Sequence, residues 1–174
     1  MRIALAAVAA AMFALPASAL ELTSTDVHNG QPLALEHNYP RCGGRNTSPQ
    51  LAWSGVPKGA KSLVLTMIDT AVKQRPGGWS HWVVLDLPAT DGSFATGNAV
   101  LPAGAHAIAS DFGDLVYAGP CPPKGTGVHT YEFTIWAMPD AKTDITDGSA
   151  KIGAWLEQHA IAHARIMGTV TPAE

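Results

Sequence analysis

The chain has 174 residues, which is enough for one domain, and 47% of them are hydrophobic, so a sizeable core can be buried. The formal net charge is −3 and only 14% of the residues are charged, which excludes the basic surface expected of a nucleic-acid-binding protein. Seventeen glycines and thirteen prolines favour a loop-rich β fold over a helical bundle.

The first 19 residues are typical of a secretory signal peptide. Arg2 gives a short positive start, Ile3 to Leu15 is an apolar run rich in alanine, and Ala17-Ser18-Ala19 is a small-x-small cleavage site. A buried N-terminal helix or a membrane anchor is the alternative, although the run is too short to cross a bilayer comfortably. We therefore expect a periplasmic or secreted protein with one domain from residue 20 to residue 174 and no membrane span in the mature chain.

Short strands separated by turns are predicted over the middle of the chain, where apolar and β-branched runs alternate with glycine and proline. The expected strands are Pro32 to Leu35, Gln50 to Trp53, Ser62 to Ile68, His81 to Leu87 and Ala107 to Ala109. The run from Ser62 to Ile68 is apolar and β-branched enough for a buried strand, and it ends at Asp69. No clear pattern precedes residue 32, and the stretch from residue 89 to residue 104 looks irregular.

A stiff loop is predicted between Tyr117 and Tyr131, because this span contains three prolines and three glycines. It leads into the clearest strand of the chain, in which apolar and mixed residues alternate from Tyr131 to Met138. His129 and Tyr131 are two residues apart and thus share one face of that strand. A rigid loop that presents polar side chains is typical of a binding site, and an ordinary hairpin connection is the alternative.

One helix is predicted from about residue 148 to residue 164, followed by a short strand from Ile166 to Val170. The residues that recur at helical spacing are Ile152, Trp155, Leu156, His159 and His163. His159 and His163 lie four apart, as two metal ligands on a helix can, but no His-Glu-x-x-His pattern is present. We therefore expect both histidines on the helix surface, in a fold that is mainly β with C-terminal helical decoration.

Three polar side chains mark the ends of predicted strands next to loops rich in proline and glycine. Asp69 ends one strand, His81 opens the next, and His129 opens the longest one with Tyr131 beside it. Two histidines and a carboxylate can bind a metal, act as an acid–base pair, or help backbone N–H groups hold a phosphate-like anion. The spacings of 12 and 48 residues form no local ligand motif, so three separate surface or capping residues are the alternative.

The chain has two cysteines, Cys42 and Cys121, and neither belongs to a Cys-x-x-Cys motif. An even pair in an oxidising compartment predicts a disulfide. Two free, buried thiols that act as small hydrophobes are the alternative.

Five motifs, in this order along the chain, resemble the phosphatidylethanolamine-binding protein family and its bacterial Raf-kinase-inhibitor-like branch. They are Asn46-Thr47-Ser48-Pro49-Gln50-Leu51-Ala52-Trp53, Ser62 to Asp69, Trp79-Ser80-His81-Trp82-Val83-Val84, Asp111-Phe112-Gly113 and Gly125-Thr126-Gly127-Val128-His129-Thr130-Tyr131. The resemblance implies two antiparallel β-sheets with C-terminal helical decoration, and one anion pocket that accepts phosphate and phosphorylated head groups. The family's pocket residues carry over onto Asp69, Trp79, His81, Pro122, His129 and Tyr131.

The chain departs from the family at the start of this pocket. The family usually has Asp-Pro-Asp-Ala-Pro where this sequence has Asp69-Thr70-Ala71-Val72-Lys73, so the first acid is kept and the second acid and both prolines are lost. In the remaining pocket, protonated His81 and His129 are the cations that we expect to face an anion.

The function that we expect is non-catalytic binding of a small phosphorylated or otherwise anionic ligand, without a cofactor. One alternative is a protein-interaction module that inhibits an exported enzyme. A second is a metal-dependent enzyme that uses Asp69, His81 and His129.

Overall fold

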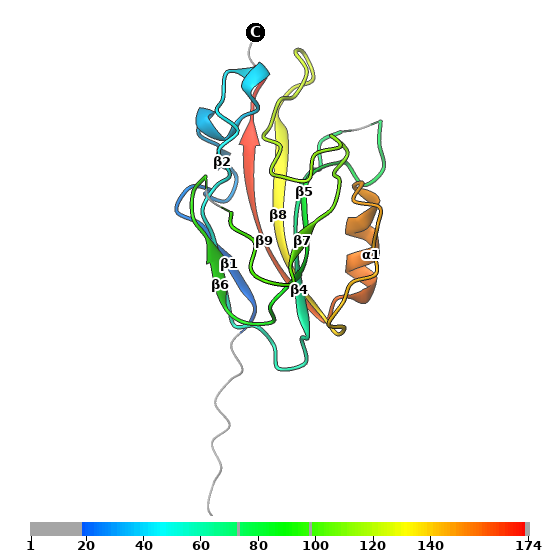
Figure 1. The fold of residues 1–174 in the computed structure, drawn as a ribbon. Coiled ribbons are helices and arrows are strands. Elements are labelled where there is room, and N and C mark those ends of the chain that lie inside the picture. Colours follow the sequence, from blue (N-terminus) through cyan, green and yellow to red (C-terminus); the bar gives the residue numbers. More distant parts are fainter. Residues whose placement is uncertain (1–18, 73, 98, 173–174) are drawn as a thin grey trace, which may run out of the picture.

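The protein is mainly β, with two sheets and one short α-helix (Figure 1). The computed structural model describes residues 19–72, 74–97 and 99–172, so the predicted signal peptide lies outside the described residues except for Ala19. None of the described helices is both long enough and apolar enough to span a membrane.

The larger sheet has six strands in the order β2-β9-β8-β4-β5-β7, and the smaller sheet has three in the order β1-β3-β6. The strands of the larger sheet are β2 (Gln31–Pro32), β4 (Ser62–Asp69), β5 (Trp79–Leu87), β7 (His106–Ala107), β8 (His129–Met138) and β9 (Ala162–Val170). Those of the smaller sheet are β1 (Glu21–Thr23), β3 (Leu51–Ser54) and β6 (Gly92–Phe94). The helices are the two 3₁₀ turns η1 (Leu35–His37) and η2 (Pro40–Cys42), and α1 (Lys151–His159).

The larger sheet lies between the smaller sheet on one side and α1 on the other (Figure 1). All eight residues of β4 are buried, because its two faces pack into two different cores. Leu63, Leu65 and Met67 join the core between the sheets, whereas Val64 and Ile68 join the core under α1. This two-sided burial explains why the strand is an unbroken apolar run rather than an alternating one.

The prediction of a mainly β fold with two sheets and a C-terminal helix is confirmed. The strands expected from residues 50, 62, 81, 107 and 131 all exist, with starts that differ by at most two residues. The strand expected from Pro32 to Leu35 is wrong, because β2 ends at Pro32 and Leu35 begins η1. One short pair, β2 with β9, is parallel, so the larger sheet is not purely antiparallel. β1 and β6 were not predicted, because strands of three residues carry too little periodicity to detect.

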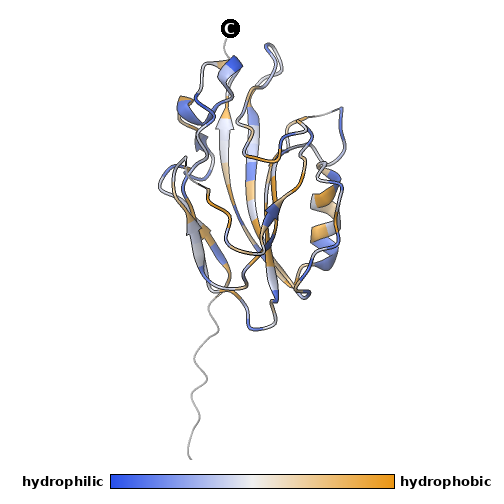
Figure 2. Cartoon of the chain, in the orientation of Figure 1, coloured by the Kyte–Doolittle hydropathy of each residue, from blue (hydrophilic) through white to orange (hydrophobic). Residues whose placement is uncertain are grey.

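The predicted extent of the C-terminal helix is wrong. α1 ends at His159, and His163 lies on the nine-residue strand β9 rather than on the helix. The helix was predicted to reach residue 164 because His163 lies four residues after His159, which fits a helical period. However, Ala162, Ala164 and Ile166 also alternate with polar residues, and pairing along β8 selects that period of two. α1 carries both hydrophobic and hydrophilic residues (Figure 2), and its Ile152 and Leu156 are buried.

Candidate functional site

Three strand ends meet at one end of the larger sheet. β4 is antiparallel to both β5 and β8, so its last residue lies beside their first residues. Asp69 pairs with Trp79 on one side and with Tyr131 on the other. The loop that joins β4 to β5 and the loop that precedes β8 therefore both rise from this end (Figure 1).

A break in the β4–β5 register places His81 in the site. Met67 pairs with Trp82 and Ile68 pairs with Ser80, which leaves His81 as an extra residue on β5. A bulge of this kind bends a strand and re-aims a side chain. Here it brings the imidazole of His81 against the Tyr131 ring, with ring centroids 5.1 Å apart.

These side chains line a cavity of about 560 Å³, and all six predicted pocket residues belong to it. The six are Asp69, Trp79, His81, Pro122, His129 and Tyr131. The other lining residues, which the sequence analysis did not predict as ligand-binding residues, are Arg41, Ala71, Val72, Gln74, Phe112, Cys121, Pro123, Gly125 and Thr126. The structure therefore brings the predicted set together, and it adds one cation and several apolar residues.

His129 forms an ion pair with Asp69 at the base of the cavity. Its Nδ1 lies 2.6 Å from Asp69 Oδ2, and its Nε2 lies 2.8 Å from Thr126 Oγ1. The Thr126 hydroxyl already donates its single proton to the Pro123 carbonyl oxygen, 2.6 Å away, so it accepts a hydrogen bond from Nε2. Both ring nitrogens thus donate, which is the pattern of an imidazolium beside a carboxylate.

His81 differs from His129 because it has no acid in contact. Its Nδ1 lies 2.7 Å from the Ala118 carbonyl oxygen, and the Ala118 N–H donates back to the His81 carbonyl oxygen. Burial lowers the pKa of His81, and the Ala118 carbonyl and the charge of Asp69 oppose this effect only in part. The prediction that His81 is a cation is therefore wrong for the unliganded protein, because its imidazole is neutral and donates from Nδ1.

The Tyr131 hydroxyl stays protonated at any ordinary pH. Its side chain is fully buried, and burial together with the negative charge of Asp69 raises the pKa of the phenol far above its usual value. Tyr131 is therefore a neutral phenol rather than a base, and its hydroxyl is hydrogen-bonded to Asp69.

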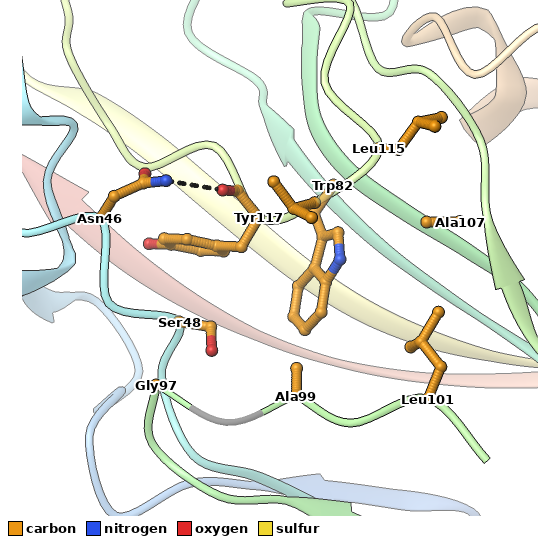
Figure 3. A pocket seen from close by; sticks show the side chains of 10 residues that line it. Asn46, Ser48, Trp82, Gly97, Ala99, Leu101, Ala107, Leu115 and Tyr117 are labelled. Atoms are coloured by element: carbon orange, nitrogen blue, oxygen red, sulfur yellow. Dashed lines mark hydrogen bonds between the residues drawn. The ribbon is translucent and has the colours of Figure 1, made fainter.

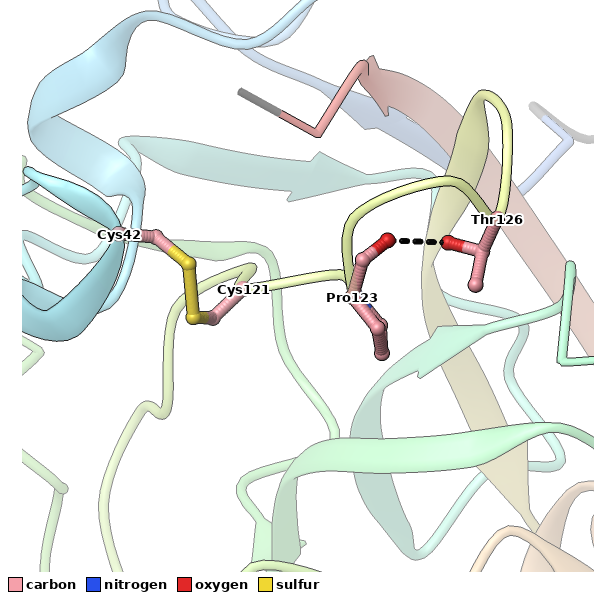
Figure 4. The surroundings of a disulfide bond; sticks show 4 residues. All are labelled: Cys42, Cys121, Pro123 and Thr126. Carbon is pink, nitrogen blue, oxygen red and sulfur yellow. Dashed lines mark hydrogen bonds between the residues drawn. A yellow bond between two sulfur atoms is a disulfide. The ribbon is translucent and has the colours of Figure 1, made fainter. Parts of the chain in front are cut away.

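A disulfide fixes one wall of the cavity. Cys42 and Cys121 are bonded, with their Cα atoms 5.4 Å apart, which confirms the predicted pairing (Figure 4). The bond ties η2, which carries Arg41, to the loop that carries Pro122 and Pro123. Figure 4 also shows the hydrogen bond from Thr126 to Pro123 that closes the far end of this loop.

Asn46 holds the start of the same loop. Its amide donates to the Tyr117 carbonyl oxygen at 2.9 Å and accepts from the Gly119 N–H at 2.7 Å. Gly119 passes so close to the His37 carbonyl that a Cβ would lie 2.1 Å from its oxygen, so only glycine fits. The loop is therefore fixed at both ends and is pre-formed.

The opposite wall depends on Asp111. This carboxylate accepts from the Ser80 and Ala150 N–H groups at 2.8 and 3.0 Å and pairs with Arg75 at 2.6 Å. The neighbouring Phe112 extends into the cavity wall, 4.9 Å from the His81 ring. The Asp111-Phe112-Gly113 motif thus supports the site, although the sequence did not assign it a role.

The two C-terminal histidines lie away from the cavity. His159 Nδ1 bonds to the Trp155 carbonyl oxygen, and His163 lies beside Arg165 and Glu157. Among the described residues, no group of three or more histidine, cysteine, aspartate or glutamate side chains has the arrangement of a metal site.

A second, smaller cavity of about 270 Å³ lies beside β5 and β7 (Figure 3). Ala99, Leu101, Leu115 and Trp82 surround it, and Figure 3 shows the Asn46 amide bonded to Tyr117 at its edge. Its described lining includes no aspartate, glutamate, histidine, lysine or arginine, and its polar side chains are those of Asn46, Ser48 and Tyr117.

The comparisons with known proteins decide the family. A family model described as phosphatidylethanolamine-binding protein matches residues 23–171. The chain belongs to the phosphatidylethanolamine-binding protein family. The Escherichia coli K12 protein YbcL is 38% identical over 164 residues, covering 88% of each chain. Its crystal structure, described as that of a new member of the mammalian PEBP family, aligns with a TM-score of 0.78 over 90% of this chain and 100% of YbcL.

Two more distant matches bear on localisation and on fold. A Mycobacterium tuberculosis H37Rv protein named as a candidate lipoprotein, LppC, is 35% identical over 156 residues, covering 88% of this chain and 73% of LppC. The structure of a carboxypeptidase Y inhibitor bound to its proteinase is 21% identical, with a TM-score of 0.57 over 91% of this chain and 85% of the other. At that identity the likeness shows the fold alone.

In this member of the phosphatidylethanolamine-binding protein family, the sequence departure noted above falls on the cavity wall. Ala71 and Val72 line the cavity directly after Asp69, while Lys73 lies outside the described residues.

Proposed function

We propose that the chain is an exported, non-catalytic protein that binds a small anionic ligand, such as phosphate or a phosphorylated group, in the cavity at the end of the larger sheet. The observation that carries the proposal is the charge of the lining. Its one carboxylate, Asp69, is already neutralised by His129, and Arg41 adds a positive charge. Among the described residues, no carboxylate lies within ion-pair distance of Arg41. A partly enclosed cavity with one uncompensated cation favours an anion.

The neutral groups around the cavity fit the same ligand. The Gln74 amide can donate hydrogen bonds to phosphate oxygens, and the pre-formed loop lowers the entropy lost on binding. Of the three residues that a metal-dependent enzyme would use, Asp69 and His129 are bonded to each other, and the Nε2 of His129 also bonds to Thr126.

The proposal predicts that inorganic phosphate binds at one site per chain in isothermal titration calorimetry. Replacing Arg41 by Gln should weaken binding by about fivefold, because one charge-assisted contact at an exposed position is lost. Arg45→Gln is the matched control, because Arg45 lies in the same loop but pairs with Glu36 and does not line the cavity. Undetectable phosphate binding to the wild-type protein, or equal effects of the two substitutions, would contradict the proposal.

Export to the periplasm or the cell exterior belongs to the same proposal. It is supported by the signal-peptide pattern of residues 1–19, by the disulfide, and by the lipoprotein name of the mycobacterial relative. Fractionation of cells that express the full chain tests it. A band of unchanged precursor mass in the cytosol would contradict it.

A second candidate function, inhibition of an exported enzyme through a protein contact, is favoured by exposed apolar residues. Val100, Leu115 and Val116 are 71%, 59% and 62% exposed around the smaller cavity. Apolar surface left open in this way is typical of an interaction site. The test is inhibition of purified exported peptidases by the wild-type protein and by Leu115→Asp, with Lys58→Ala as a surface control. Inhibition that survives Leu115→Asp unchanged would remove this candidate.

A further inference from the structure

The cavity has no carboxylate available for a cation. Asp69 is the single acid among the described lining residues, and both of its oxygens are occupied. Oδ2 accepts from His129 Nδ1 at 2.6 Å, and Oδ1 accepts from the Ala71 N–H at 2.9 Å. Asp69 is only 3% exposed, so a ligand cannot reach its oxygens without disrupting these bonds. An ammonium group on the ligand would therefore lose water without gaining an anionic partner.

The wall that follows Asp69 is apolar. Ala71 and Val72 line the cavity there, and Pro122 and Phe112 are further apolar residues of the lining. A carboxylate at Ala71 or Val72 would have lined the cavity. As the chain stands, these four residues offer a ligand methyl groups and ring carbons, which favours an alkyl or aryl group next to the bound anion.

The aromatic residues do not form an open cage for an ammonium group either. The Arg75 guanidinium lies over the Trp79 ring, 4.4 Å from its centroid, so one face of the indole is already covered by a cation. Phe112 is enclosed by Tyr39, Trp79 and His81, with ring centroids 5.9, 5.8 and 4.9 Å away. Cation–π binding needs free ring faces, and the contacts of Trp79 with Arg75 and of Phe112 with its three neighbouring rings occupy part of these faces.

We propose that this cavity selects phosphomonoesters whose organic group is uncharged and apolar, and that it discriminates against those that carry an ammonium group. The inference rests on the proposed anion site and specifies its ligand class. The cavity should therefore favour an alkyl or aryl phosphate over a phosphorylated amine of the same size.

The sharpest test compares propyl phosphate with O-phosphoethanolamine, which have the same shape and differ only by a methyl group in place of an ammonium group. Calorimetric titration of the full-length protein should give at least roughly tenfold tighter binding of propyl phosphate. Equal affinities, or tighter binding of O-phosphoethanolamine, would overturn the inference and leave the anion site standing. If neither these esters nor inorganic phosphate bind, the proposed function itself fails.

A substitution at Ala71 identifies the cause of the preference. Ala71→Asp adds the missing carboxylate to the wall and should reduce the preference for propyl phosphate to about threefold or less. Ala71→Asn has the same shape without the charge and should keep the wild-type ratio. If Ala71→Asp folds and keeps that ratio too, the missing carboxylate is not the cause and the inference is overturned. The wild-type ranking decides the question if this variant does not fold.

Discussion

At the scale of single residues, the site contains two buried histidines in opposite protonation states. His129 has an acid on one side and a committed hydroxyl on the other, so its ring nitrogens both donate. The His81 ring bonds to the Ala118 carbonyl oxygen, and burial lowers its pKa and favours the neutral form. The charge of each histidine is therefore set by the atoms in contact with its ring, and not by the residue type alone.

The neutral state of His81 predicts a pH-dependent stability. Because its pKa is lowered in the folded protein, only the unfolded chain takes up this proton as the pH falls below about 6.5. The free energy of unfolding should therefore be fully retained above that pH and should decrease as the pH falls toward the folded-state pKa. The slope from this residue is at most about 1.4 kcal/mol per pH unit.

Urea unfolding of the wild type and of His81→Gln at pH 7.5 and pH 5 measures this effect. Glutamine does not titrate, and its amide can still donate to Ala118, so the variant should lose less stability at the lower pH. The equally buried His37 is present in both proteins, and the comparison therefore isolates His81. An identical loss in both proteins would contradict the assigned state of His81.

At the scale of elements, the disulfide has two effects on the cavity. It closes a loop of 79 residues and it holds η2 against the loop that precedes β8. The first effect stabilises the fold by restricting the unfolded chain. The second keeps Arg41 at the cavity, although its side chain is exposed and no ion pair with another described residue holds it there.

Replacing both cysteines, as Cys42→Ser with Cys121→Ser, should lower the free energy of unfolding by up to about 4–5 kcal/mol, the chain-entropy value for a loop of this length. Urea unfolding measures the loss, and thiol titration of the denatured wild-type protein should find no free cysteine. An unchanged unfolding midpoint, or two reactive thiols in correctly exported protein, would show that the bond does not form in the cell.

The elements differ in how far the sequence predicts them, and the differences have physical reasons. β4, β5 and β8 were predicted because each is a long run buried on both faces or alternating clearly. The first residues of β9 were predicted as helix because His163 fits the helical spacing from His159, and only the pairing with β8 selects the strand. β1 and β6 form because they pair with β3, and no local sequence pattern predicts this pairing.

The residues of the candidate site also differ in how far the sequence predicts them. Its polar residues lie at strand ends next to proline- and glycine-rich loops, so they could be predicted, and the resemblance to a family added Trp79 and Pro122. Arg41 could not be assigned, because a 3₁₀ turn and a disulfide bring it to the cavity from far along the sequence. The bulge that orients His81 depends on the pairing register of β4 and β5, which a sequence does not specify. The hydrogen bonds to both carboxylate oxygens of Asp69 depend on interatomic distances, which a sequence does not specify either.

At the scale of the whole molecule, one scaffold carries two cavities of different chemistry. The segment from Tyr117 to Cys121 serves both, since Tyr117 lines the apolar cavity and Cys121 lines the charged one. The chain is negative overall, yet the charged cavity carries an uncompensated arginine. The local charge, rather than the net charge, therefore favours the larger cavity as the anion site.

The most direct test of this claim is a titration of the ¹⁵N-labelled protein with phenyl phosphate, followed through the backbone amide resonances. The account predicts that the largest shifts fall on the walls of the charged cavity, at Ala71, Gly125 and Thr126, and that they become much smaller in His129→Ala. Shifts that gather instead at Ala99 and Leu115 beside the apolar cavity, or no shifts at all, would contradict it.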